Sequence, residues 1–488
     1  MKKLLRLLFR LLLFTIFIIT GVVVVKTAGV SSKQANISTI TPVNIPDGAE
    51  ERFSKAIQFK TISSPDFFDK TAFLAQDSFI FNQYTLVDSF LERIEITPYS
   101  LVYKWAGKKP DLAPILLMGH LDVVPVEKES LSKWEEAPFS GLIKDGFIWG
   151  RGTLDDKLSV FGTLEAVEQL LSEGYSPNRT IYLAFGHDEE IGGVNGAQKI
   201  AAWFKNKNIQ FEYILDEGQL VLEKAMNGIE KRVALIGLAE KGYVTLTLTA
   251  RMEHGGHSSM PPKETAIGVL SQAIVDLQNN PFPGKINGAV AQFLAHTSPE
   301  MSWPYKAFLS NLWLTEGLLI RQMSADISTS PMVRTTTSPT IINGGIKDNV
   351  LPSFARAKIN FRIIPGETQA TVVEYVRKII NDNRIEISNE DGGNEPSAVS
   401  GINTFGYQVI QKTIQEIFPD VIVAPSLVIA ATDSRHYSQV ANNTYRFMPI
   451  QLQKSDLSRI HGMNERVSVE NYRQAIRFYR QLVVNSGR

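Results

Sequence analysis

The sequence predicts an α/β fold: a mixed, mostly parallel sheet sandwiched by helices, with an inserted ferredoxin-like α+β domain. Three observations support this. Up to residue 239, short apolar segments alternate with helical patterns, as in parallel sheets with crossover helices. Between residues 240 and 391 the order becomes strand-helix-strand-strand-helix-strand, which is typical of a ferredoxin-like unit. The patterns of residues 392–488 then return to the first domain.

Hydrophobic periodicity assigns the elements of the first domain, which we place at residues 48–239. Helical patterns cover residues 49–59 and 71–90, and the second predicts one long amphipathic helix. A third helix precedes Gly174, a residue type that commonly follows a helix end. That helix covers residues 158–173, and the strands of this domain are expected at residues 101–105, 115–119, 181–185 and 213–215.

The inserted domain is expected to cover residues 240–391 and to act as a lid or a dimerisation domain. Its first strand, at residues 244–252, alternates apolar and polar side chains, as an antiparallel strand with one wet face does. Its other elements are a helix at 265–278, strands at 335–342 and 355–363, a helix at 368–381 and a strand at 384–388. The second part of the catalytic domain, residues 392–488, contributes a strand at 421–424 and a helix at 469–484.

The amino-acid composition limits the kinds of functional site that the chain can contain. The chain has 488 residues, of which 44% are hydrophobic, enough for more than one domain with its own core. Fifty basic and fifty acidic residues cancel, so no basic footprint for nucleic acid is present. The absence of cysteine excludes disulfides, thiolate metal sites and a cysteine nucleophile. Any metal must therefore be held by histidine, aspartate or glutamate, and the chain has seven histidines.

The first 29 residues have the pattern of an export signal. Four cations precede an apolar run at residues 11–25, and a polar linker follows at residues 30–47. The run is long for a cleaved signal peptide and short for a full span of about 20 residues, so signal peptide and signal anchor both stay open. In either case we expect an exported protein, either membrane-anchored or secreted, periplasmic or luminal.

His120-Leu121-Asp122 stands at the end of the apolar run of residues 115–119. In extended backbone, residues i and i+2 point to the same side. A histidine there can hold a metal while the carboxylate two residues on fixes the imidazole ring. We therefore predict that His120 is a metal ligand and that Asp122 orients it.

Further clusters of acidic residues and a late histidine favour a site with two metals. Asp155 follows a glycine-rich turn and precedes a helix, and a carboxylate there can bridge two cations, although an ordinary helix cap is the alternative. Glu189 and Glu190 follow the strand at 181–185, where open α/β sheets place their sites; the alternative is a solvated acidic loop. Asp216 follows the strand at 213–215, and His461 can supply a second nitrogen ligand, although a lone late histidine is more often structural.

In combination these motifs resemble the co-catalytic zinc peptidase family that includes aminoacylase, glutamate carboxypeptidase and succinyl-diaminopimelate desuccinylase. The matching segments are Met118 to Pro125, Gly150 to Lys157, Asp188 to Glu190, and Asn343 to Pro352, in family order. The resemblance covers the chain from about residue 48 to the C-terminus. Segments 134–139, 432–437 and 460–467 are most similar to vacuolar carboxypeptidase S and to the secreted N-fatty-acyl-amino-acid synthase/hydrolase.

The resemblance implies two Zn²⁺ ions per subunit and a role for each matching residue. Asp155 would bridge the zincs, Glu190 and His461 would complete one site, and His120 and Asp216 the other. Glu189 would be the general base.

The resemblance also implies groups that hold the substrate. His257 would stabilise the oxyanion, and in many relatives this histidine comes from the partner subunit of a homodimer. Arg362 matches a position that holds the substrate carboxylate, Arg435 is its rival, and Asn349 lies in the fourth matching segment.

The expected function is zinc-dependent hydrolysis of an amide bond beside a free carboxylate, as a carboxypeptidase on short peptides. The alternative is an aminoacylase-type hydrolase or synthase of N-(fatty-)acyl amino acids. Residues 281–334 are rich in aromatic and leucine side chains, which suit an acyl pocket but also an enlarged core or a subunit contact. A catalytically silent binding protein on this fold is the alternative of another class.

Overall fold

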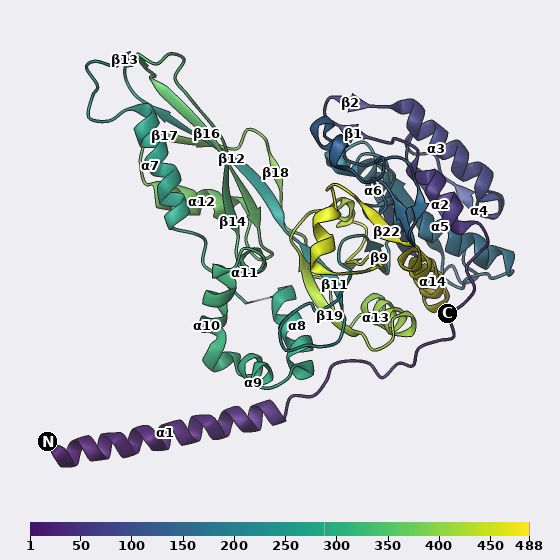
Figure 1. Ribbon diagram of the computed structural model, residues 1–488, viewed down its shortest axis with the longest axis horizontal. Helices are drawn as coiled ribbons and strands as arrows, with labels where there is room; N and C mark the ends of the chain where they lie inside the picture. Colours follow the sequence, from purple (N-terminus) through teal and green to yellow (C-terminus); the bar gives the residue numbers. More distant parts are fainter. Residues whose placement is uncertain (287, 488) are drawn as a thin grey trace.

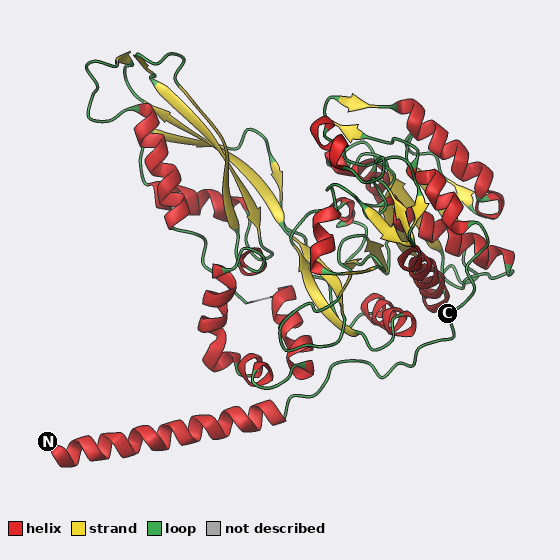
Figure 2. Ribbon diagram, viewed as in Figure 1, coloured by secondary structure: helices red, strands yellow, loops and turns green. Residues whose placement is uncertain are grey.

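The computed structural model describes residues 1–286 and 288–487. Its largest unit is built on a mixed ten-stranded sheet, and a smaller unit projects from it (Figures 1 and 2). They correspond to the two domains expected from the sequence, and we call them the catalytic domain and the lid. The α/β class with an inserted α+β unit is therefore confirmed. The strands of the large sheet are, in spatial order, β21 (Gln451–Leu452), β10 (Val221–Leu222), β11 (Val233–Glu240), β20 (Thr444–Arg446), β9 (Tyr213–Asp216), β5 (Ile115–His120), β8 (Ile181–Gly186), β4 (Leu101–Trp105) and β3 (Glu92–Arg93), with β19 (Ile422–Val428) paired to β11.

Helices cover both faces of this sheet because its central strands are apolar on both sides. One face packs against α2 (Ala49–Ile57), α5 (Lys157–Ser172), α13 (Phe405–Ile417) and α14 (Val469–Ser486). The other face packs against α6 (Ala197–Asn206) and the short η4 (Asp433–Tyr437). Around the sheet lie β1 (Ser63–Ser64), β2 (Phe67–Phe68), β6 (Ile143–Lys144), β7 (Phe147–Trp149), β22 (Arg466–Ser468), η1 (Lys128–Lys133), η2 (Glu189–Ile191) and η5 (Lys454–Arg459).

The predicted single helix at residues 71–90 is wrong: the structure has α3 (Lys70–Gln83) and α4 (Thr85–Phe90), which meet at Tyr84. The break lets the buried Tyr84 hydroxyl donate to Glu165 Oε1 at 2.8 Å. The new helix start is capped by Glu168 of α5, which accepts the backbone N–H groups of Leu86 and Val87 at 3.0 and 2.8 Å. Because both acids lie about 80 positions further along the chain, the local pattern could not reveal them.

The lid is an antiparallel sheet with helices on one side. Its strands lie in the order β14 (Thr336–Gly344), β16 (Phe354–Ile363), β12 (Gly242–Arg251) and β17 (Ile385–Ser388), with β18 (Gly393–Asn394) also paired to β12. Helices α7 (Ala266–Asn279) and α12 (Gln369–Ile380) bury the apolar side chains of this sheet in a core separate from that of the catalytic domain. The short ribbon β13 (Gly256–His257) and β15 (Val350–Leu351) lies at the far tip of the lid (Figure 1).

Between α7 and β14 the chain inserts α8 (Gly288–Thr297), η3 (Ser298–Glu300), α9 (Tyr305–Ser310), α10 (Leu312–Ala325) and α11 (Ser330–Val333). The buried side chains of these helices, such as Leu294, Leu309 and Met323, join the catalytic core and not the lid core. Much of the apolar content of residues 281–334 therefore extends the larger domain. Helix α1 (Lys2–Ala28) runs away from the body beside α9 (Figure 1).

Candidate metal centre and active site

Three parallel strands bring their carboxyl ends to one edge of the large sheet. Strand β5 lies between β9 and β8 and is parallel to both. His120 is the last residue of β5, Glu189 and Glu190 open η2 just after β8, and Asp216 ends β9. Asp155 lies just before the N-cap residue of α5 on the same edge, beside His120. The predicted residues therefore meet where an open α/β sheet places its site.

The carboxylate of Asp155 lies between two histidines. Its Oδ1 atom is 2.9 Å from His120 Nε2, and its Oδ2 atom is 2.9 Å from His461 Nε2. Glu190 Oε2 lies 3.2 Å from the same atom of His461. Each oxygen of one carboxylate thus faces a different imidazole nitrogen, which is the arrangement that a bridging ligand requires.

A buried glutamate holds the two loops that carry Asp155 and His461. Glu465 accepts the backbone N–H groups of Gly152 and Leu154 at 2.9 and 2.8 Å and also pairs with Arg151. Arg151 in turn donates to the His461 carbonyl at 3.0 Å. Through this pair, residues 310 positions apart are fixed relative to each other. Sequence reasoning missed Glu465, although it stands four residues after His461 in a matching segment.

Glu217, and not Asp216, lies beside the histidine of β5. Glu217 Oε1 is 3.3 Å from His120 Nε2. The Asp216 carboxylate instead accepts the backbone N–H of Ser434 at 2.9 Å and that of Glu217 at 3.0 Å. Strand alternation explains this, because Asp216 shares the face of Ile214, which packs toward η4. The geometry therefore favours Glu217 as the ligand from this loop.

Asp122 fixes both the histidine and the glutamate pair. Its carboxylate accepts the backbone N–H groups of Glu189 and Glu190 at 3.2 and 3.1 Å and lies 3.4 Å from His120 Nδ1. Burial raises the pKa of the Glu189 carboxyl well above its usual range, and the nearby Asp433 and Glu190 carboxyls act in the same direction. A glutamate with a raised pKa is suited to accept and then return a proton.

The charge of the cluster fits a set of divalent cations. Hydrogen bonds to Asp155 and Glu190 raise the pKa of His461 to about 10, so this site draws positive charge strongly. Two buried oxygens, Asp156 Oδ1 and Glu190 Oε1, have no hydrogen-bond partner among the described residues. Two groups of donors lie close enough to share an ion, His120 with Asp155 and Glu190, and His120 with Asp156 and Glu217. Imidazole and carboxylate donors suit zinc.

Asp433 is a further buried carboxyl near this cluster that sequence reasoning did not single out. It is 3% exposed, and neither of its oxygens has a hydrogen-bond partner among the described residues. Burial raises its pKa well above the usual range, and the charge of Asp216 adds to the effect. Its position directly before Ser434 and Arg435 in a matching segment was the available signal.

His257 and Asn349 lie together, but at the tip of the lid and not at the metal centre. The Ser258 N–H donates to the Asn349 carbonyl at 3.1 Å across the β13–β15 ribbon. His257 is exposed, and its Nδ1 lies 2.8 Å from the Ser259 hydroxyl. Figure 1 places β13 at the end of the lid farthest from the catalytic domain. Within one chain these two residues therefore do not reach the other predicted site residues.

The two candidate carboxylate clamps approach one cavity. A cavity of about 600 Å³ lies between η4 and the lid, and Arg435 lines it together with Tyr243, Asn394 and Asn442. Arg362 stacks on the ring of Tyr243, with 5.5 Å from its guanidinium carbon to the ring centroid. Arg435 thus faces the cavity itself, whereas Arg362 stands behind one of its walls.

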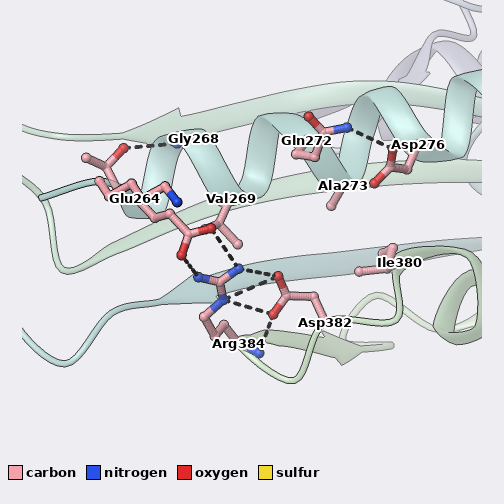
Figure 3. A pocket seen from close by; sticks show the side chains of 11 residues that line it. Glu264, Gly268, Val269, Gln272, Ala273, Asp276, Ile380, Asp382 and Arg384 are labelled. Carbon is pink, nitrogen blue, oxygen red and sulfur yellow. Dashed lines mark hydrogen bonds and ion pairs between the residues drawn. The ribbon is translucent and has the colours of Figure 1, made fainter.

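A second hollow, of about 360 Å³, lies on the lid between α7 and β17 (Figure 3). Arg384 occupies its floor and donates to Glu264 at 2.6 Å and to Asp382 at 2.7 Å. None of the predicted site residues lines it within the described chain. These contacts satisfy the arginine and tie β17 to the start of α7.

Comparison with known proteins finds a matching family model and similar relatives. The family model for "Peptidase family M20/M25/M40" matches residues 116–485. Probable carboxypeptidase S-like 2 of Dictyostelium discoideum is 43% identical over 95% of this chain and 91% of its own length. The human N-fatty-acyl-amino acid synthase/hydrolase PM20D1 is 40% identical over 90% of this chain and 87% of its own. Carboxypeptidase S of Saccharomyces cerevisiae is 31% identical over 89% and 83%.

The fold has solved counterparts. A metallo-carboxypeptidase from Sulfolobus solfataricus superimposes with a TM-score of 0.64, at 18% identity, over 90% of this chain and 99% of its own. Human carnosine dipeptidase 1 gives a TM-score of 0.59 at 14% identity, over 91% of this chain and all of its own. With the match over residues 116–485, the chain belongs to peptidase family M20/M25/M40, a family of hydrolytic enzymes.

Proposed function

We propose that the chain hydrolyses an amide bond beside a free carboxylate, as a carboxypeptidase on short peptides, with two zinc ions in the metal centre. The observation that carries the proposal is the placement of Asp155 between His120 and His461, at 2.9 Å from each. His461, Glu190 and one oxygen of Asp155 would hold one ion. His120, Glu217 and the other oxygen would hold the second, with Glu217 in the place expected for Asp216.

The reaction divides between the ions and the side chains. Zinc held in this site would supply a more acidic water and would polarise the scissile carbonyl. Glu189 would accept a proton from the attacking water and deliver it to the nitrogen of the leaving amine. Asp122 holds Glu189 in place through its backbone N–H and keeps the His120 ring oriented. Burial raises the pKa of the Glu189 carboxyl, which suits the return of the proton to the leaving amine.

The substrate carboxylate is best placed against Arg435. This guanidinium lines the cavity between the catalytic domain and the lid, next to Ile191 and Gly192 of the segment that begins with Glu189. Arg362 would act from behind Tyr243 by holding that ring. An extended charged fork of this kind matches a carboxylate with two hydrogen bonds.

A homodimer would complete the site. His257 lies too far along the lid to serve its own chain, so we propose that it stabilises the oxyanion in the active site of a partner subunit. The exposed edge strand β14 and the exposed Ile267 and Val275 of α7 offer a lid surface for this contact. Asn349 is hydrogen-bonded to the segment that contains β13, so it would enter the partner's active site together with His257.

Hydrolysis or synthesis of N-fatty-acyl amino acids is a second candidate, favoured by an apolar groove. The groove holds about 580 Å³ and is lined by Met301, Phe308 and Leu319 of the inserted segment. Lys454, at its rim, begins η5, which leads directly to His461. A long acyl chain would fit such a groove, and the relatives named PM20D1 carry this activity in their names.

Helix α1 fits a signal or an anchor, because it is long and apolar enough to cross a membrane. We propose that it directs the body to the outside of a membrane and stays attached to it. Deleting residues 1–28 should leave the specific activity unchanged and abolish export. Export that persists without them would contradict the proposed location.

The substrate test compares two amides on the full-length protein in detergent with zinc. A long-chain N-acyl amino acid and an N-blocked dipeptide are supplied at equal concentration, with Glu189→Gln as the inactive control. Faster cleavage of the dipeptide supports the carboxypeptidase, and faster cleavage of the acyl amino acid supports the second candidate. Turnover that survives Glu189→Gln would contradict the assignment of the base.

A further inference from the structure

We propose that the surface formed by α9 and α10 rests on the lipid bilayer that α1 enters. Five large side chains make up this surface, which we call the aromatic corner: Trp303, Tyr305, Trp313, Leu314 and Leu318, which are 60%, 43%, 51%, 52% and 59% exposed. So large an apolar group on one corner of a folded body marks a contact site. The inference rests on the proposed membrane location of α1 but not on the proposed substrate.

Helix α1 itself identifies the partner. It has 27 residues, about 40 Å at the usual rise per residue, and its apolar side chains are exposed along nearly its whole length. A helix of this length and composition matches the hydrocarbon core of a lipid bilayer, which is about 30 Å thick. Its cations at Lys2, Lys3, Arg6 and Arg10 lie at the end away from the body. Because the cationic end of a spanning helix stays on the cytoplasmic side, Ala28 and the body that follows it lie on the opposite side of the membrane.

The last turn of α1 is docked on the aromatic corner. Thr27 is 1% exposed and accepts a hydrogen bond from the Asn311 amide at 3.0 Å. Asn311 is equally buried, and it joins α9 to α10. The ammonium of Lys26 lies 5.2 Å from the ring centroid of Trp313. The point where α1 leaves the bilayer is therefore fixed next to Trp313.

The chemistry of the aromatic corner suits this depth. Tryptophan and tyrosine concentrate at the level of lipid headgroups, where an apolar ring and a polar N–H or O–H are both accommodated. On α10, Leu314, Leu318 and Arg321 follow one another at i, i+4 and i+7 on one face. Two leucines dipping into the acyl boundary beside an arginine at the headgroups is the pattern of an interfacial helix.

The arrangement of the body agrees with the contact. The body lies to one side of α1, with α9 and α10 nearest to it and the tip of the lid away from it (Figure 1). Spanning helices tilt by roughly 0–40°. An α1 that crosses at such a tilt brings the aromatic corner to the headgroups before any other part of the body.

Tryptophan fluorescence tests the contact because α1 has no tryptophan. Trp303 and Trp313 are two of the six tryptophans, and the other four lie outside the inserted helices. Full-length protein is placed in nanodiscs whose lipids are brominated near the headgroup, brominated near the chain end, or unbrominated. We expect emission to be quenched most by bromine near the headgroup. Trp303→Phe with Trp313→Phe should lose most of this quenching, whereas the matched control Trp203→Phe should keep it.

A second pair of variants leaves both reporters in place. Leu314→Asp with Leu318→Asp should reduce the quenching of Trp303 and Trp313, and Leu131→Asp, at an exposed leucine of η1, should not. Quenching that is equal in all variants would overturn the proposal. A second result would also overturn it: both tryptophans are protected from quenching by acrylamide in the water, yet brominated lipid does not quench them. A second copy of the protein would then cover the aromatic corner. Loss of the protein from the nanodiscs would overturn the membrane location as well, while dipeptide hydrolysis in the same samples tests the proposed catalysis separately.

Discussion

Glu217 Oε1 lies 3.3 Å from the Nε2 atom of His120, and both side chains are buried. The neighbouring Asp216 turns to the opposite face of β9, where it accepts the Ser434 N–H. Adjacent acids at a strand end thus separate into one that faces the metal centre and one that holds η4. Their side chains point to opposite faces because successive side chains of a β-strand alternate between the two faces of the sheet.

Replacing these two acids one at a time distinguishes their parts. Glu217→Gln should lose one of two bound zinc ions on dialysis, because it removes a charged donor from the His120 half of the centre. Asp216→Asn keeps an acceptor for Ser434 and should retain both. Metal analysis by mass spectrometry reads out the stoichiometry. The reverse result, with zinc lost only in Asp216→Asn, would restore the assignment made from the sequence.

Asp122 should affect catalysis and zinc binding indirectly, by holding the groups that it hydrogen-bonds in position. Asp122→Asn weakens its bonds to Glu189, Glu190 and His120 and should lower kcat/KM or zinc affinity by about 10–100-fold. Asp188→Asn is the matched control, because Asp188 also accepts two backbone N–H groups, from Asn195 and Gly196, without touching a proposed ligand. Equal losses in the two variants would mean that Asp122 only stabilises the fold.

The junction between β11 and β12, where Lys241 lies, should make a pH-dependent contribution to stability. Burial lowers the pKa of Lys241 to about 7, while its Nζ donates to the carbonyls of Pro331 and Arg334. The unfolded chain, with the ordinary lysine pKa of 10.5, binds more protons than the folded one between pH 7 and 10.5. The contribution of Lys241 to stability therefore rises with pH in that window, by up to about 1.4 kcal/mol per pH unit.

Thermal unfolding of Lys241→Met checks this sign. The Tm of the unmodified chain minus that of the variant should increase from pH 7 to pH 10. Lys358→Met, at a lysine paired with Asp391 on the lid, serves as control and should leave the difference flat. A Tm difference for Lys241→Met that is constant or falls with pH would show that Lys241 is protonated throughout in the folded protein.

A dimer that shares His257 predicts rescue between two inactive variants. Glu189→Gln and His257→Ala should each lose activity alone. After random re-association, half of the dimers combine one chain of each kind, and one of their two sites has both residues intact. The mixture should then recover about a quarter of the original activity. No recovery, with mixed dimers confirmed by mass spectrometry, would contradict the shared site.

Much of the centre could be predicted because its ligands follow short strands. The apolar runs before His120 and before Glu189 mark buried parallel strands, and such strands align their carboxyl ends. What failed depended on contacts between distant residues. The break at Tyr84 exists because Glu165 and Glu168 satisfy it from α5, and no local pattern contains that information.

The same limit applies to the lid. The order of its strands and helices along the chain was predictable from the sequence pattern, but the placement of His257 at the distal tip depends on the length of the β12 and β16 strands and on their junction with the catalytic domain. The inserted helices were recognisable as apolar, yet only packing shows that Leu294 and Met323 belong to the catalytic core and that Trp313 stays exposed.

Zinc titration of the metal-free protein tests the central claim most directly. The chelated, full-length enzyme should be inactive on its preferred amide and regain activity in proportion to zinc, reaching a plateau at two equivalents per chain. Asp155→Asn should abolish that plateau, because each oxygen of Asp155 faces a different histidine. Full activity in the chelated protein, or a plateau at one equivalent with no effect of Asp155→Asn, would contradict the two-metal centre.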